Sequence, residues 1–241
     1  MEQGETNIFV TISGLPGSGK TALGQCLDNM SPGEIDPSFN EHFLNIHTIP
    51  MRWLLAQQGY QGSNTIAELQ AFHQNLREEE KSHHVFDSLR QIKDGIVIVD
   101  SIRNIDDLRY MQQKFGALAI GLKVPLSVAR DRFMKDQDDD KHKHSFIVFG
   151  GDIDDESLDA KERIVQARNL AWEHAITEVG EDPEHYDCIE QADVVIDASV
   201  SFGQVAVAAK EQIREFIKSK LAERSQTARS SSVAPPLASA N

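Results

Sequence analysis

Residues 14–21 of the chain read GLPGSGKT and match the pattern G-x-x-x-x-G-K-[ST]. Glycines in such a loop adopt backbone angles that other residues resist, and they let N–H groups approach a phosphate. The helix that starts at the end of the loop adds partial positive charge. We expect Lys20 to reach the β- and γ-phosphates of ATP or a close analogue, and Thr21 to ligate Mg²⁺. The predicted phosphate-binding set is Gly14, Leu15, Pro16, Gly17, Ser18, Gly19, Lys20, Thr21 and Ala22.

The sequence on either side of this loop supports the same interpretation. Asn7–Ser13 reads NIFVTIS and is typical of a buried strand, because it is rich in β-branched and aromatic residues. Lys20–Met30 then continues as a predicted helix. A chance glycine turn is the alternative, but the loop lies between a strand and a helix, where the phosphate-binding pattern must lie.

A second candidate for the same site is Asp100, which ends the apolar run GIVIVD at 95–100. In a parallel sheet, ligands collect at the carboxyl ends of the strands. A carboxylate there can hold Mg²⁺ directly or through water, or it can act as a base. The alternative is an Asp that caps the following turn. We expect Asp100 to be a catalytic and metal-binding residue together with Lys20 and Thr21.

Strand-like and helix-like segments alternate along most of the chain. Expected strands cover 7–13, 43–48, 95–100, 117–124 and 193–198, and expected helices cover 20–30, 50–58, 65–92, 106–115, 125–135, 156–179 and 203–224. This alternation predicts an α/β fold with a parallel sheet and helices on both faces. We expect one domain over 1–224. Residues 225–241 are rich in Ser, Ala and Pro and are expected to be a disordered tail.

The composition restricts the partners and the compartment. The chain has 241 residues and a net charge of −14, and this acidity argues against nucleic acid as a partner. It contains two cysteines, so a disulfide framework is not expected. No apolar run is long enough to span a bilayer, and the polar N-terminus is unlike a secretory signal. These features predict a cytoplasmic protein.

The loop GLPGSGKT, the segment VIVDSIRN at 97–104 and the segment VARDRFMK at 128–135 together resemble the nucleoside monophosphate kinase group of P-loop proteins. The likeness covers Asn7–Lys220 and is greatest to the dephospho-CoA kinase-like and adenylate kinase-like branch. Similar domains also accompany some deoxycytidylate deaminases. The resemblance implies a five-stranded parallel sheet, a helical substrate-binding insertion at 31–92 and a lid at 136–155. It also implies phosphoryl transfer from Mg-ATP to a nucleotide-like small molecule.

The resemblance further implies roles for several arginines. Arg52, Arg77 and Arg103 match positions that bind the substrate in the family. Arg130 and Arg132 match arginines that contact the transferred phosphoryl group. A later arginine of the family is replaced here by Lys135, or by Lys141 and Lys143, and lysine keeps the charge but loses the bidentate fork. A solvated helix face is the alternative for Arg130 and Arg132.

Two functions remain open at this point. One is a small-molecule kinase, and the other is a P-loop switch or NTPase without a phosphate acceptor. A GTPase is disfavoured because the sequence has no N-K-x-D pattern. The His-rich and acidic stretches at 78–84 and 138–144 have no recognised metal-ligand spacing. An arginine-lined pocket opposite the loop is the feature that a kinase needs and a switch does not.

Overall fold

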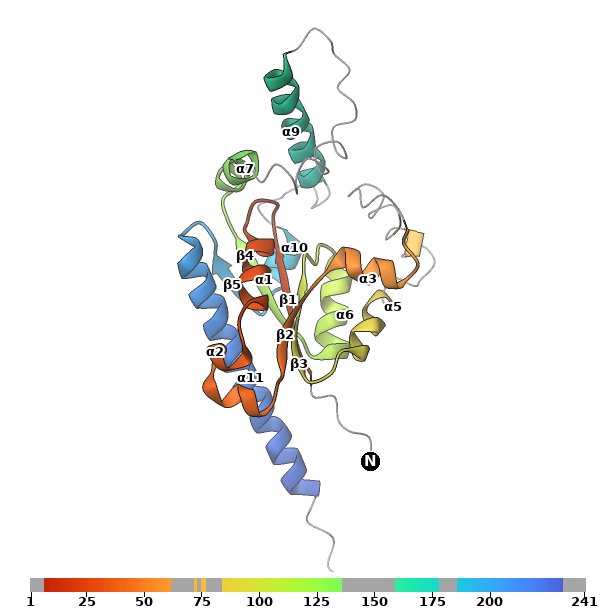
Figure 1. The fold of residues 1–241 in the computed structure, drawn as a ribbon, viewed down its shortest axis with the longest axis vertical. Coiled ribbons are helices and arrows are strands. Elements are labelled where there is room, and N and C mark those ends of the chain that lie inside the picture. Colours follow the sequence, from red (N-terminus) through yellow and green to blue (C-terminus); the bar gives the residue numbers. More distant parts are fainter. Residues whose placement is uncertain are drawn as a thin grey trace, which may run out of the picture.

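The centre of the protein is one parallel β-sheet, seen edge-on among its helices in Figure 1 of the computed structural model. The structure describes residues 7–61, 72, 75–76, 84–135, 159–177 and 186–231. The strand order is β2-β3-β1-β4-β5, and every pair is parallel. The strands are β1 (Ile8–Gly14), β2 (Asn45–Pro50), β3 (Gly95–Asp100), β4 (Leu118–Lys123) and β5 (Val194–Asp197). The predicted five-stranded fold is therefore confirmed.

The two central strands are buried along their whole length, as their apolar, β-branched sequences predict. Their register pairs Ile12 of β1 with Asp100 of β3. On the other side of β1, Gly14 pairs with Leu122 of β4. The carboxyl ends of β1, β3 and β4 consequently meet at one edge of the sheet. The predicted functional residues around 14–21 and 100–103 follow these strand ends.

Helices cover both faces of the sheet (Figure 1). Helices α1 (Lys20–Asp28) and α11 (Phe202–Ser231) contact each other on one face, and α6 (Ile105–Phe115) and α10 (Asp187–Glu190) contact each other on the opposite face. Two further helices, α7 (Leu126–Lys135) and α9 (Ala160–Thr177), also contact each other, and α9 stands away from the sheet. The remaining helical segments are α2 (Pro32–Ile35), η1 (Pro37–Glu41), α3 (Met51–Gln57), α5 (His84–Asp87) and η2 (Ser88–Gln91).

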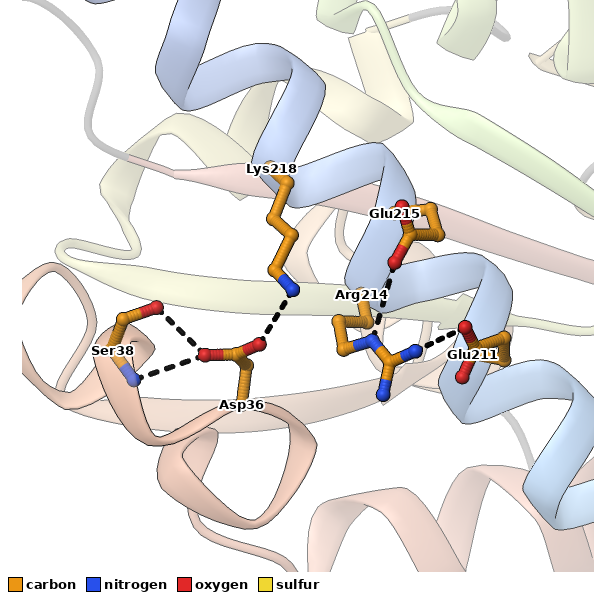
Figure 2. Close-up of polar contacts among 6 residues, drawn as sticks. All are labelled: Asp36, Ser38, Glu211, Arg214, Glu215 and Lys218. Atoms are coloured by element: carbon orange, nitrogen blue, oxygen red, sulfur yellow. Dashed lines mark hydrogen bonds and ion pairs between the residues drawn. The ribbon is translucent and has the colours of Figure 1, made fainter.

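The segment that follows α1 is tied to the last helix by an ion pair (Figure 2). The ammonium of Lys218 on α11 lies 2.9 Å from Asp36. The other oxygen of Asp36 accepts hydrogen bonds from the backbone and the hydroxyl of Ser38 at 3.1 and 2.7 Å. On α11 itself, Arg214 pairs with Glu211 and Glu215. Residues at the start of the predicted insertion are thus fixed to the core domain.

Several boundaries differ from the sequence-based expectation. The range 31–92 includes β2, which is an edge strand of the main sheet. The last helix does not end at Arg224 but continues to Ser231, so the tail expected from 225 begins as helix. Its Ala, Gln and Arg residues favour helix once the buried preceding turns have nucleated it. Residues 232–241, the lid range 136–155 and most of 62–83 lie outside the described residues.

No helix within the described ranges is both long and apolar enough to cross a membrane.

Candidate functional site: the phosphate-binding loop and the strand ends beside it

The predicted loop connects β1 to α1, and its glycines adopt the backbone angles that the pattern requires. Gly17 has φ 75° and Gly19 has φ 92°, both in the left-handed region that favours glycine. Gly19 caps the N-terminus of α1 in this conformation. Leu15 is buried in the core, so what it offers the site is its backbone rather than its side chain. The first-turn residues Thr21 and Ala22 are exposed.

Helix α7 lies directly against the tip of the loop. A Cβ atom built on Gly17 would be 2.2 Å from the backbone carbonyl oxygen of Ala129. Only glycine allows an approach this close, so this position needs glycine for both its space and its backbone angle. The helix that leads into the predicted lid range therefore rests on the loop that is expected to hold phosphates.

Lys20 places its ammonium inside the loop. The Nζ atom donates hydrogen bonds of 2.8 Å to the carbonyl oxygens of Gly14 and Leu15. Burial lowers the pKa of Lys20 to about 7; nearby Arg103 lowers it further, and Asp100 partly compensates by raising it. A buried ammonium beside a second cation favours the binding of an anion. A phosphate bound here would raise the pKa of Lys20 again.

Thr21 and Asp100 meet at the same edge. The Thr21 hydroxyl donates a hydrogen bond of 3.2 Å to Oδ2 of Asp100. The second oxygen, Oδ1, accepts a hydrogen bond of 3.0 Å from the hydroxyl of Ser101. Asp100 is 5% exposed, since β3 is covered on both faces. The strand register, which sets Asp100 opposite Ile12, brings the carboxylate to the first turn of α1.

Three observations indicate that the residues of the loop and Asp100 fit a magnesium–nucleotide ligand. Hydroxyl and carboxylate oxygens are the donors that Mg²⁺ prefers, and Mg²⁺ usually takes only one or two protein ligands with the rest from phosphates and water. The Ser18 hydroxyl is buried within the loop and has no hydrogen-bond partner among the described residues. The ammonium of Lys20 supplies the positive charge. No group of three or more His, Cys, Asp or Glu that could cage a metal occurs in the described part of the chain.

Arg103 follows Asp100 in the loop between β3 and α6. It is half-buried and close enough to Lys20 to lower that residue's pKa. Asn104 fixes the end of this loop because its side chain accepts hydrogen bonds from the first backbone N–H groups of α6. From the opposite side, the buried Tyr186 donates a hydrogen bond of 3.3 Å to the carbonyl of Ile102. Arg103 is thus held near the phosphate-binding loop by its neighbours in sequence and in space.

The two arginines of α7 bind protein partners. Arg130 is exposed and donates a hydrogen bond of 3.2 Å to the Asn169 side chain of α9. Arg132 donates to the carbonyl oxygens of Ala198, Ser199 and Val200, in the loop after β5. In this conformation Arg132 connects α7 to the β5 end of the sheet. Contact of either side chain with a phosphoryl group stays a prediction.

The side chains of the other substrate candidates lie outside the part of the chain that the structure describes. Arg52 falls on α3, and its side chain lies outside the described residues, as do Arg77, Lys141, Lys143 and the His-rich stretch at 142–144. Sequence reasoning missed Ser101, whose hydroxyl donates to the adjacent Asp100, and Tyr186, whose contact with the carbonyl of Ile102 depends on tertiary structure. It also missed Arg168, which donates a 3.0 Å hydrogen bond from α9 to the carbonyl of Met134 on α7. Its position on the helix that follows the predicted lid range was the available signal.

The strand order and the loop in its strand–helix setting define a P-loop NTPase fold of the kinase-like type. Residues 10–159, more than half of the chain, match the AAA domain family, and the chain belongs to that family. No curated protein sequence is significantly similar to it.

Three solved structures illustrate the structural likeness. APE1195 is 18% identical, with 89% of this chain and 97% of that chain covered and a TM-score of 0.50. A shikimate kinase from Bacteroides thetaiotaomicron is 15% identical, covering 88% and 98% of the two chains, with a TM-score of 0.46. A sugar kinase from Janibacter sp. is 13% identical, covering 84% and 92%, with a TM-score of 0.40. Sequence identities this low show similarity of fold alone. The TM-scores of the two kinases are too low for these structures to support the fold assignment.

Proposed function

We propose that the protein is an ATP-dependent phosphotransferase that acts on a small nucleotide-like molecule. The observation that carries the proposal is the meeting of Lys20, Thr21 and Asp100 around one phosphate-binding loop, with Arg103 beside them. Lys20, Thr21 and Asp100 suit a magnesium–polyphosphate ligand, and Arg103 adds a second cation beside Lys20. Catalysis of phosphoryl transfer consists mostly of positioning and charge stabilisation, which these groups are suited to provide.

Each side chain has a distinct role in the proposal. Bound Mg-ATP supplies the γ-phosphoryl group. Lys20 neutralises charge on the terminal phosphates, and Thr21 and Asp100 hold the cation through oxygen atoms. Arg103 binds the phosphate or another anionic group of the acceptor, because a guanidinium forms strong paired hydrogen bonds with such groups. Arg130 and Arg132 approach the transferred group only if they leave the partners they have in this structure.

The acceptor class is proposed from the resemblance of the 97–104 and 128–135 segments to nucleoside monophosphate and dephospho-CoA kinases. A nucleoside monophosphate or dephospho-CoA offers the anionic group that Arg103 would bind. Arg52 and Arg77 are proposed to complete this pocket. A cytoplasmic location and the lack of a nucleic-acid partner remain predictions from composition and charge.

The direct test is turnover. The full chain is incubated with Mg-ATP and a panel of nucleoside monophosphates plus dephospho-CoA, and ADP formation is measured with each acceptor. We expect at least one acceptor to raise ADP formation well above the rate with ATP alone. The Lys20→Ala variant, purified in the same way, controls for contaminating kinases. Acceptor-independent hydrolysis, or no ADP with any acceptor, would argue against a phosphotransferase of this class.

A second function is favoured by one observation. Arg132 is bound to three backbone carbonyls of the loop after β5, which suits a structural link better than a transfer residue. A nucleotide-binding switch or NTPase needs the loop and its cation but no arginine-lined acceptor site. Nucleotide binding or hydrolysis without transfer to any acceptor would support this alternative.

A further inference from the structure

Ser101 has an unusual backbone conformation directly after the site carboxylate. Its φ is 70°, and Ser101 and Asp94 are the two non-glycine residues with positive φ in the part of the chain that the structure describes. For a residue with a side chain this conformation costs free energy and persists only where the surroundings enforce it. The backbone N–H of Ser101 donates a hydrogen bond of 3.1 Å to the carbonyl of Ile12 on β1, which holds the turn against the central strand.

The turn directs the Ser101 hydroxyl back to its neighbour. The hydroxyl donates a 3.0 Å hydrogen bond to Oδ1 of Asp100, while Thr21 donates a 3.2 Å hydrogen bond to Oδ2. The carboxylate is therefore held by one hydroxyl on each oxygen. A glycine at position 101 would adopt φ 70° without strain but would lack this hydroxyl. The conformation that serine resists is accompanied by a contact that only its side chain can make.

We propose that Ser101 is a positioning residue that fixes the orientation of the Asp100 carboxylate, so that Oδ2 stays beside the Thr21 hydroxyl as a divalent-cation ligand. This inference rests on the proposed function, because it assigns Asp100 and Thr21 to the cation that accompanies the nucleotide. Ser101 itself touches neither the nucleotide nor the acceptor in the proposal. Its effect passes through Asp100, in the same way that residues hydrogen-bonded to a metal ligand orient that ligand in other proteins.

The experiment measures cation affinity rather than turnover. Mn²⁺ replaces Mg²⁺ as a paramagnetic probe, and its binding to the protein with a non-hydrolysable ATP analogue is followed by electron paramagnetic resonance. Ser101→Gly and Ser101→Ala both remove the hydroxyl. We expect each to weaken Mn²⁺ binding by about three- to ten-fold, the effect of one lost hydrogen bond. Binding of the analogue without a divalent cation should not change.

The two substitutions differ in strain, and this separates positioning from a structural role. Ser101→Gly relieves the positive φ and should be the more stable variant, whereas Ser101→Ala keeps the strain. If the effect on Mn²⁺ were only structural, the glycine variant would bind as well as the wild type. Wild-type affinity for Mn²⁺ in Ser101→Gly would therefore overturn the inference. Loss of affinity in both variants, independent of their melting temperatures, would support it.

Two controls complete the design. In an Asp100→Asn background, Ser101→Gly should cause no further loss of Mn²⁺ affinity, because the hydroxyl acts through the carboxylate. Asp94→Gly relieves the other positive φ, at 53°, and should leave Mn²⁺ binding unchanged. An additional loss in the Asp100→Asn background would contradict the inference. If the wild-type protein binds no Mn²⁺ in the presence of the analogue, the proposed function fails together with the inference. If the wild type binds Mn²⁺ and Ser101→Gly binds it equally well, only the inference fails.

Discussion

The hydroxyl of Thr21 and the carboxylate of Asp100 are 3.2 Å apart although 79 residues separate them in the chain. The first turn of α1 presents Thr21, and the end of β3 presents Asp100. The parallel pairing of β1 with β3 brings these two ends together. This contact joins the phosphate-binding loop to the segment that carries Arg103, so changes in one part of the site should be measurable in the other.

Lys20→Ala should weaken Mg-ATP binding by about ten- to hundred-fold without unfolding the protein, because hydrogen bonds to a charged group contribute about 1.5–3 kcal/mol. The Lys20 ammonium bonds to carbonyls of the loop rather than to the core, so the melting temperature should stay close to that of the wild type. Thr21→Ala should have a smaller effect. Calorimetry and thermal melting measure both quantities.

Lys123→Ala is the matched control for Lys20→Ala, since Lys123 is an exposed lysine at the end of the neighbouring strand β4. It should bind Mg-ATP as the wild type does. Equal affinity of Lys20→Ala and the wild type would remove the basis for a nucleotide site at this loop.

Three glycine substitutions should separate backbone strain from steric contact. Gly19→Ala meets nothing within 4 Å but has φ 92°, so we expect a loss of about 1–2 kcal/mol in the free energy of unfolding. Gly17→Ala adds a clash with the Ala129 carbonyl and should cost more, displace α7 and reduce nucleotide affinity. Gly203→Ala introduces neither a positive-φ strain nor a steric clash and should change the free energy of unfolding little. Urea unfolding gives the three values, and equal losses for Gly17→Ala and Gly19→Ala would show that α7 does not rest on the loop.

Substitutions of Asp100 and of Arg103 should affect different kinetic parameters. Asp100→Asn is expected mainly to lower kcat, because it removes stabilisation that matters most in the transition state. Arg103→Ala is expected mainly to raise KM for the acceptor while ATP affinity stays nearly intact. Steady-state kinetics and ATP calorimetry on both variants test the division. Loss of ATP binding in Arg103→Ala with acceptor affinity retained would assign the arginine to the ATP side instead.

The Asp36–Lys218 ion pair should contribute a pH-dependent part of stability (Figure 2). The Lys218 ammonium, with smaller contributions from Ser38, lowers the pKa of Asp36 from 3.8 to about 2. A carboxyl group with a depressed pKa stabilises the fold above its unfolded-state pKa, and this stabilisation is lost as the pH falls through the folded-state pKa. The urea midpoint of the wild type should therefore fall more steeply between about pH 4 and pH 2 than that of Asp36→Asn.

Asp36→Asn keeps an oxygen that can accept from Ser38, so it isolates the ion pair. Glu41→Gln, which changes an exposed carboxylate of the same segment, should retain the wild-type pH profile. Because Lys218 is exposed to solvent, high salt should reduce the difference between the wild type and Asp36→Asn. Parallel profiles for these two proteins at low salt would contradict the assignment.

Removal of residues 225–241 should leave folding and nucleotide binding nearly unchanged. Residues 225–227 continue α11 but are exposed, so little apolar surface is lost with them. A deletion starting at Leu221 should lower the melting temperature clearly, because Leu221 packs against the core and Arg224 donates a hydrogen bond to the carbonyl of Asn7. A large fall for the shorter deletion would show that the end of α11 stabilises the domain.

The sequence by itself determined the features that depend on local patterns. The glycine spacing of 14–21 gave the loop, because its backbone angles and approach distances exclude other residues. The apolar runs at 7–13 and 95–100 predicted the central strands, since a strand covered on both faces must be apolar throughout. Alternating strands and helices then gave a parallel sheet. The end of the last helix was predicted too early because its exposed final turns carry no apolar periodicity.

Only the tertiary structure decided which side chains meet. Strand order and register set Asp100 against Thr21, and no local pattern encodes a contact between such distant residues. Packing between separate elements also produces the positive φ of Ser101 and the approach of Ala129 to Gly17. The same is true of the hydrogen bonds from Arg132 to the loop after β5. The resemblance of the segment 128–135 to the kinase family implied that Arg132 contacts a ligand. Its neighbours in space determine that, in this conformation, it binds backbone carbonyls instead.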